Sequence, residues 1–331
     1  MNGRASAKGE KATSIRMEFE DNGKLAVLTG EHNANLAQLE SALEVTLDSF
    51  GNSITISGPA AAAKKARRAL EDIYKRLDEA DGSLPVDTSL VRDALRWVEA
   101  GDAAPASGQG LDTWKKKIIA KTPGQKDYLG LLRSREVVFG LGPAGTGKTY
   151  MAVAKAVESL KKREVERIVL SRPAVEAGER LGFLPGDMKE KVDPYLRPLY
   201  DALYDMMPAD KVDRMLVSGE IEIAPLAFMR GRTLSASYVI IDEAQNTTPV
   251  QMKMVLTRLG QDSHMVITGD LSQIDLADAQ PSGLAEAVRI LDDIRGVGII
   301  HLSGEDVVRH PVVARILQAY EAGQKPQNAS K

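Results

Sequence analysis

The chain has 331 residues, 43% of them hydrophobic and 27% charged, and a formal net charge of −3. Its length predicts about two domains of an ordinary globular protein, and its charge excludes a global attraction to nucleic acid, so such binding would need local patches. Because the sequence has no cysteine, disulfides, thiolate metal sites and a cysteine nucleophile are excluded, which suits a reducing compartment.

The N-terminus predicts a leader without a targeting role. Residues 1–13 are mostly small and polar, and we expect them to be disordered. They do not resemble a signal peptide, and no run of apolar residues is long enough to span a membrane. We therefore expect a cytoplasmic protein with no membrane partner.

A compact alternating pattern over residues 14–80 predicts a small α+β domain. Apolar spacing and turn residues predict a strand at 24–29, a helix at 35–43, a hairpin of 44–49 with 53–57, and a helix at 59–77. This strand–helix–hairpin–helix order resembles a KH-like nucleic-acid-binding module. A KH domain clamps the backbone with a Gly-x-x-Gly loop between two helices, whereas Gly30 here precedes the first predicted helix.

The predicted helix at 59–77 is strongly basic. Its cations could follow a nucleic-acid backbone, but a basic run can equally be a solvated surface, so contact with RNA or DNA stays open. The six are Lys64, Lys65, Arg67, Arg68, Lys75 and Arg76.

Residues 81–114 are rich in Ala, Gly, Asp and Ser and predict a linker with one short helix at 91–100. From 115 to 322 strands and helices alternate, which predicts an α/β domain whose parallel sheet has helices on both faces. A polar tail follows at 323–331. The expected strands are 136–140, 167–171, 221–224, 238–241, 265–267 and 297–300, and the expected helices include 150–160, 248–260 and 311–320.

A Gly-x-x-x-x-Gly-Lys-Thr motif lies between the first of these strands and its helix, which is the context of a nucleotide-binding phosphate loop, or P-loop. Its glycines let backbone N–H groups form an anion nest. Lys148 would contact the β- and γ-phosphates, and the Thr149 hydroxyl would bind Mg²⁺. The loop consists of Gly142, Pro143, Ala144, Gly145, Thr146, Gly147, Lys148 and Thr149.

Two acids follow the apolar strand at 238–241, at the sheet edge where ligands of such sheets bind. Asp242 fits the acid that holds Mg²⁺, and Glu243 the carboxylate that polarises the attacking water. The pair favours hydrolysis over kinase chemistry. No Asn-Lys-x-Asp guanine-binding motif is present, so we expect ATP rather than GTP.

Two glutamines resemble nucleotide contacts of superfamily-one helicases. The stretch Gly269-Asp270-Leu271-Ser272-Gln273 resembles their Gly-Asp-x-x-Gln element, so Gln273 would sense the γ-phosphate. Gln125 precedes the P-loop at the position of their adenine-recognising glutamine, whose amide can pair with both N6 and N7 of adenine.

Several long motifs resemble the PhoH-like family of phosphate-starvation-inducible ATPases. These motifs are residues 171–186, 191–200, 229–233 and 306–310. The resemblance as a whole extends over about residues 25–320. It implies one helicase-like P-loop ATPase core, a KH-like N-terminal module, homo-oligomeric rings such as hexamers, and a role in RNA metabolism.

An arginine on the γ-phosphate accelerates phosphoryl transfer by roughly 10³–10⁵-fold. Two-core helicases supply it from the second core, and this chain has one, so we expect a neighbouring subunit to supply it. Arg309 is the first candidate, and Arg230 and Arg232 are alternatives. Arg172, Glu179 and Arg180 occupy the region where helicases contact single strands, although a structural loop is an equal reading.

The leading hypothesis is an ATP-driven machine that binds RNA, with single-stranded RNA as one option, and acts as a helicase or remodeller. The alternatives are a nucleotide-dependent switch acting on a protein or ribosomal partner, and a DNA helicase. Aromatic residues are only 5% of the chain, and no basic–aromatic platform for base stacking is visible.

Overall fold

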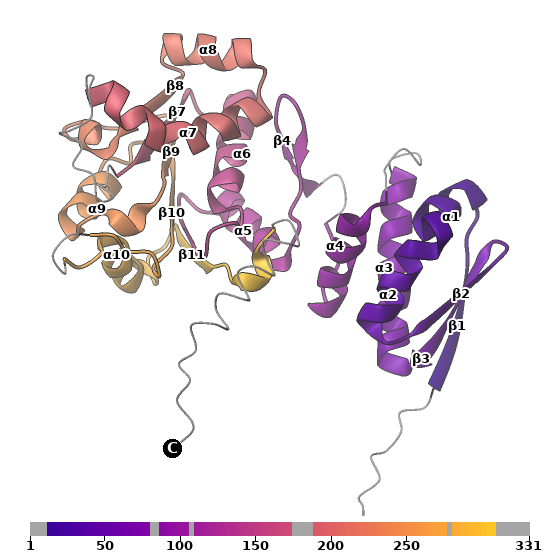
Figure 1. The fold of residues 1–331 in the computed structure, drawn as a ribbon. Coiled ribbons are helices and arrows are strands. Elements are labelled where there is room, and N and C mark those ends of the chain that lie inside the picture. The colour runs from indigo at the N-terminus through magenta and orange to yellow at the C-terminus, as the bar shows by residue number, and fades with distance from the viewer. Residues whose placement is uncertain (1–11, 80–85, 106–108, 174–187, 277–279, 309–331) are drawn as a thin grey trace, which may run out of the picture. The chain divides into compact units, whose positions relative to one another are not determined.

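The computed structural model describes residues 12–79, 86–105, 109–173, 188–276 and 280–308 (Figure 1). The chain forms two compact units. One comprises Met1–Gly110 with Ile119–Pro123, and the other Leu111–Ile118 with Gly124–Lys331. In the described parts, no helix has the length and apolar character needed to cross a membrane.

The N-terminal unit is a three-stranded antiparallel sheet covered by helices, with strand order β1-β3-β2. Ile15 of β1 and Leu47 of β2 both pair with Ile56 of β3. In chain order the elements are β1 (Ala12–Glu18), α1 (Asn22–Thr29), α2 (Ala34–Leu43), β2 (Thr46–Phe50), β3 (Ser53–Pro59), α3 (Ala60–Glu79) and α4 (Thr88–Glu99).

The core of this unit forms where α3 lies against the sheet. Ile54 and Ile56 alternate toward the helices and are fully buried, as the two-residue period of a strand requires. On α3 the buried positions recur every three or four residues, and the first three are alanines, which let the helix approach the sheet closely. They are Ala63, Ala66, Ala69, Leu70, Ile73 and Leu77.

The strand expected at residues 24–29 is wrong, because these residues form α1. Asp21 caps this helix by accepting hydrogen bonds from the N–H groups of Gly23 and Lys24. Residues 30–33 therefore connect two helices, whereas the sequence placed them before the first helix. Gly30, His32 and Asn33 all have positive φ in this connection. The hairpin and the helices at 35–43 and 59–77 are confirmed, with ends shifted by one or two residues.

The helix expected at 91–100 exists as α4, but it is not an isolated helix in a linker. Val91, Ala94, Leu95 and Val98 are buried in the core of the N-terminal unit. The composition of this range predicted a linker because the apolar residues are few. Their spacing nevertheless puts them on one face of the helix.

The C-terminal unit is built on a six-stranded parallel sheet of order β11-β6-β10-β9-β7-β8, which confirms the predicted α/β class. The strands are β6 (Val137–Leu141), β7 (Arg167–Arg172), β8 (Ile221–Pro225), β9 (Ser237–Ile241), β10 (His264–Gly269) and β11 (Val297–His301). All six coincide with predicted strands. The order places β10 between β6, which leads into the P-loop, and β9, which delivers Asp242 and Glu243.

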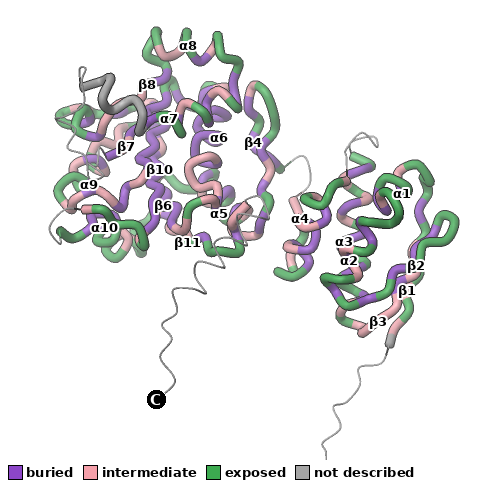
Figure 2. Tube along the Cα trace, in the orientation of Figure 1, coloured by how far each residue is buried: buried purple, intermediate pink, exposed green. Residues whose placement is uncertain are grey.

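Helices cover both faces of this sheet (Figure 1), whose central strands are largely buried (Figure 2). Val138, Ile240 and Val266 pack with α5, α6 and α7, and their neighbours Phe139, Ile241 and Ile267 pack with α9 and α10. The helices are α5 (Pro123–Ser134), α6 (Lys148–Lys161), α7 (Met188–Met206), α8 (Ala209–Ser218), α9 (Pro249–Leu256) and α10 (Gly283–Leu291). α9 begins with a capping box of Thr248 and Gln251, and it ends at Leu256, short of the predicted end at residue 260. The helix expected at 311–320 and the tail lie outside the described residues.

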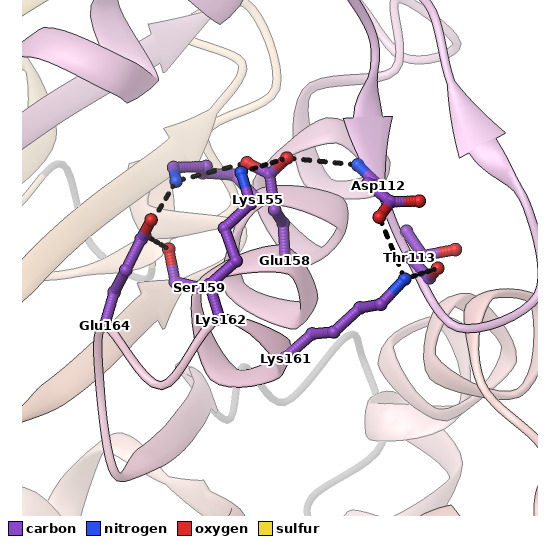
Figure 3. Close-up of polar contacts among 8 residues, drawn as sticks. All are labelled: Asp112, Thr113, Lys155, Glu158, Ser159, Lys161, Lys162 and Glu164. Atoms are coloured by element: carbon purple, nitrogen blue, oxygen red, sulfur yellow. Dashed lines mark hydrogen bonds and ion pairs between the residues drawn. The ribbon is translucent and has the colours of Figure 1, made fainter.

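A short hairpin, β4 (Leu111–Asp112) with β5 (Lys117–Ile118), is fixed to the C-terminal end of α6 (Figure 3). The buried Glu158 accepts hydrogen bonds from the Asp112 N–H at 3.1 Å and from Lys155 at 3.3 Å, and Lys155 also contacts Glu164. Lys161 Nζ donates to the Asp112 carboxylate and to the Thr113 carbonyl. The hairpin is therefore held on the sheet unit by charge-assisted bonds.

Candidate nucleotide-binding site

The P-loop curls between β6 and α6 through glycines that other residues could not replace. Gly142, Gly145 and Gly147 have φ values of 137°, 89° and 82°, a region that disfavours side chains. A Cβ on Gly142 would lie 2.2 Å from the Leu302 carbonyl oxygen. The loop ends at the N-terminus of α6, where free N–H groups and the helix dipole favour an anion.

Lys148 lies over this loop. Its Nζ donates to the carbonyls of Gly142 at 2.5 Å and Pro143 at 2.8 Å. Beneath the loop, the buried Tyr128 hydroxyl donates to the Lys148 carbonyl at 3.4 Å, and burial raises the pKa of Tyr128. The loop is therefore supported from below by the buried Tyr128 and has the cation of Lys148 on its open side.

Thr149 and Asp242, the two residues expected to bind Mg²⁺, contact each other beside the P-loop. The Thr149 hydroxyl donates to Asp242 Oδ1 at 2.6 Å, and Thr268 donates to the same oxygen at 2.7 Å. Asp242 is buried at the end of β9. A hydroxyl next to a buried carboxylate fits Mg²⁺, which takes one or two protein oxygens together with phosphate and water.

Glu243 follows with a strained backbone, because its φ is 51°, a region that is uncommon for a non-glycine residue. Its Oε2 accepts a hydrogen bond from Gln245 Nε2 at 2.6 Å. Gln245 Oε1 in turn accepts from the Asp270 N–H at 3.1 Å. This fully buried glutamine therefore links the end of β9 to the end of β10.

Gln273 lies in the turn after β10. Its Nε2 donates to Asp270 Oδ2 at 2.8 Å, and the other oxygen of Asp270 accepts from the Ser272 hydroxyl and N–H. The Gly-Asp-x-x-Gln element is therefore a compact turn organised around Asp270, with the exposed amide of Gln273 at its rim.

Arg172 ends β7 on the far side of the two acids. Its Nη2 is 3.4 Å from Glu243 Oε1, and its Nη1 is 3.9 Å from Asp242 Oδ2. The sequence suggested a nucleic-acid contact for this residue, but the structure places it in the nucleotide site. The side chains of Glu179 and Arg180 lie outside the described residues.

These groups surround one cavity of about 620 Å³. Eight of the residues predicted for the nucleotide site line it: Ala144, Gly145, Gly147, Lys148, Thr149, Asp242, Glu243 and Gln273. The cavity is also lined by residues that no sequence motif indicated, namely Tyr150 and the α7 residues Pro198, Asp201, Ala202 and Asp205. Their spacing of three and four places the α7 residues on one face of that helix, but Pro194 and Pro198 kept α7 from being predicted.

Asp205 is tied to neighbours on both sides. It contacts Lys116 from β4–β5 and accepts a hydrogen bond from the Tyr150 hydroxyl at 2.7 Å. The hydrogen bond from Lys116, which has the larger effect, and the bond from Tyr150 lower the pKa of Asp205. The wall formed by α7 is thus connected to the hairpin.

Gln125 does not line the cavity. It is buried under the loop, where its Nε2 donates to the Thr146 carbonyl at 3.0 Å. Arg232 lies elsewhere and forms a two-point pair with Glu222 at 2.6 and 2.7 Å, and Arg230 is exposed. Arg309 lies outside the described residues.

Comparison with known proteins agrees with this geometry. A family model described as PhoH-like protein matches residues 117–321. The PhoH-like protein of Bacillus subtilis (strain 168) is 62% identical over 206 residues, which cover 62% of this chain and 65% of that protein. That of Mycobacterium tuberculosis (strain ATCC 25618 / H37Rv) is 47% identical over 303 residues, covering 90% and 85%. Protein PhoH of Escherichia coli (strain K12) is 41% identical over 260 residues, covering 77% and 72%.

Proposed function

Because this chain belongs to the PhoH-like family, an ATPase-like P-loop family, we propose that it binds ATP with Mg²⁺ and hydrolyses it, and that hydrolysis is coupled to the binding or remodelling of RNA. The meeting of Thr149 with the buried Asp242 beside the P-loop carries the first part of this proposal. A hydroxyl and a carboxylate placed together beside a P-loop suit a metal-bound phosphate chain.

In this mechanism each residue of the site has one task. Lys148 and the backbone N–H groups of the P-loop would hold the phosphates. Thr149 and Asp242 would hold Mg²⁺, which would neutralise charge on the phosphate oxygens. Glu243 accepts a proton from the attacking water. The water oxygen bonds to the γ-phosphorus while the bond to the bridging oxygen breaks, which leaves ADP and phosphate.

Gln273 and Gln125 have proposed roles of their own. Gln273 can turn from Asp270 toward the γ-phosphate, since it lies on the cavity rim. Gln125 would select adenine, for which its amide would have to leave the carbonyl of Thr146.

The RNA part of the proposal is supported by α3. Four of its six cations, Lys64, Lys65, Arg68 and Lys75, are exposed and make no ion pair with any residue that the structure describes. Uncommitted cations along one helix can neutralise phosphates. We further propose that the active form is a homo-oligomer, in which Arg309 of one subunit acts on the nucleotide of its neighbour.

The first experiment measures ATP hydrolysis by the full chain with and without single-stranded RNA and DNA, and Glu243→Gln is the control. We expect RNA to stimulate hydrolysis and Glu243→Gln to abolish it while nucleotide binding persists. Stimulation by DNA alone would favour a DNA helicase, and indifference to both would favour a switch acting on a protein partner. The absence of nucleotide binding would overturn the proposal.

A further inference from the structure

The nucleotide cavity holds more negative than positive charge. Its lining includes five carboxylates, from Asp201, Asp205, Asp242, Glu243 and Asp270. Two cations, Lys148 and Arg172, are the only ones among its described lining residues. A triphosphate that enters with Mg²⁺ adds further negative charge, so each of these two cations matters for its binding.

The sheet itself fixes the position of Arg172. β7 and β9 are parallel neighbours in which Ser171 pairs with Ile241, and the Asp242 N–H donates to the Ser171 carbonyl at 2.8 Å. Arg172 and Asp242 are the next residues on each strand, so the register brings the guanidinium beside the two acids. No loop rearrangement is needed to keep it there.

Arg172 lies between the two acids and is held closely by neither of them. Its distances of 3.4 Å to Glu243 and 3.9 Å to Asp242 exceed the roughly 2.7–2.9 Å of a charge-assisted hydrogen bond. Because Oε2 accepts the hydrogen bond from Gln245, Oε1 is the oxygen left for water, and this is the oxygen that faces Arg172. A carboxylate in this state is poorly placed to accept a proton from water.

We propose that Arg172 binds the γ-phosphate in the same subunit, and that this movement releases Glu243 to act as the base. The inference rests on the proposed hydrolysis of ATP. A phosphate that presents two of its oxygens matches the guanidinium fork better than two separate carboxylates do. Asp242, once it held a metal ion, would no longer attract the guanidinium as its second partner. Occupation of the site by a triphosphate thereby switches on the catalytic carboxylate, whereas a diphosphate leaves Arg172 on Glu243.

The test compares Mg²⁺-dependent binding of ADP and of a non-hydrolysable β,γ-methylene ATP, together with kcat and KM for ATP. For Arg172→Ala we expect the affinity for the triphosphate analogue to fall about tenfold or more, ADP affinity to stay within about twofold, and kcat to fall about 10²-fold or more. Arg172→Lys should be intermediate, because a lysine keeps the charge but lacks the fork. Arg214→Ala, which removes an exposed arginine paired with Asp210 on α8, should match the parent.

A double-mutant cycle tests the release of Glu243. Glu243→Gln removes the ionic partner of Arg172, so we expect the affinity for the triphosphate analogue to rise several-fold. The same substitution in an Arg172→Ala background should produce no rise. A structural role for Arg172 would not create this coupling.

Two results would overturn the inference. One is an unchanged ratio of triphosphate to diphosphate affinity in Arg172→Ala, and the other is faster hydrolysis by that variant, which would make Arg172 a restraint alone. ADP binding confirms that each variant is folded. A parent protein that binds neither nucleotide would instead refute the proposed function.

Discussion

Glu243 is held in an unfavourable conformation by its neighbours. A positive φ costs a non-glycine residue about 1–3 kcal/mol and persists only when the surroundings enforce it. Here the bond from Gln245 Nε2 at 2.6 Å, together with the bond from the Asp270 N–H to Gln245 Oε1, joins the carboxylate to the turn that carries Gln273. Gln245 is therefore a positioning residue for the base.

We expect Gln245→Ala to lower kcat for ATP by about 10–100-fold with little change in KM, because a base displaced by about 1 Å loses a rate factor of that order. Steady-state hydrolysis measures both constants. Gln251→Ala is the matched control, since Gln251 Oε1 also accepts a backbone hydrogen bond, from Thr248 N–H, but at the start of α9. It should cost at most about 1 kcal/mol of stability and leave kcat unchanged. Equal kcat values for the two variants would remove Gln245 from this role.

Among individual residues, the sequence predicted those whose place is determined by a local motif. The P-loop and Thr149 follow from a strand, a loop and a helix in succession, and Asp242 follows from its place after an apolar strand. The place of Arg172 could not be predicted, because it depends on β7 lying beside β9 in this register. The wall formed by α7 depends likewise on how distant elements pack.

Individual elements show where local sequence is ambiguous. Residues 24–29 are a short, largely apolar run, which periodicity alone cannot assign to strand or helix. The cap at Asp21 decides in favour of the helix. The strands of the parallel sheet were predictable because burial on both faces requires continuous apolar runs.

The network that fixes the hairpin to α6 predicts a pH-dependent stability. Burial alone would raise the pKa of Glu158, but bonds from the Asp112 N–H, Lys162 and Lys155 outweigh it and hold the pKa below the usual value of 4.5. A lowered pKa stabilises the fold above about pH 4.5, and this contribution is lost as the pH falls through the folded-state value.

We therefore expect Glu158→Gln to lower the free energy of unfolding by about 1–3 kcal/mol at pH 7. The difference from the parent should shrink as the pH falls below 4.5. Urea unfolding followed by circular dichroism at several pH values measures this. Glu71→Gln, which breaks the exposed Arg67 pair on α3, should cost less than about 0.5 kcal/mol. A pH-independent difference would contradict this account of Glu158.

The exposed cations of α3 predict a salt-dependent affinity for RNA. Alanine at Lys64, Lys65 and Arg68 together should preserve the helix, because alanine has the highest helix propensity. If three phosphates are contacted, the slope of log affinity against log salt should become smaller by about 2 for single-stranded RNA. RNA-stimulated hydrolysis should fall while basal hydrolysis stays at the parental rate. A parental slope in this variant would place RNA elsewhere.

At the scale of the whole molecule, a mixing experiment distinguishes action in the same subunit from action between subunits. We expect Glu243→Gln and Arg309→Ala to be inactive separately and to regain part of the activity when mixed, since a mixed oligomer contains sites with an intact base and an intact neighbour. A mixture of Glu243→Gln with Arg172→Ala should regain no activity. Arg172 acts in the same subunit as Glu243, so every site in this mixture lacks one of the two residues. Inactivity of both mixtures would argue against a trans-acting Arg309.

The β4–β5 hairpin has a practical consequence for recombinant fragments. The chain passes between the two units after Gly110, after Ile118 and after Pro123, so no single cut separates them cleanly. A fragment that starts at residue 117, where the family match begins, lacks Asp112 and would leave the buried Glu158 without its backbone donor. An expression boundary at residue 110 keeps the hairpin intact, and it should yield the more soluble and more heat-resistant product.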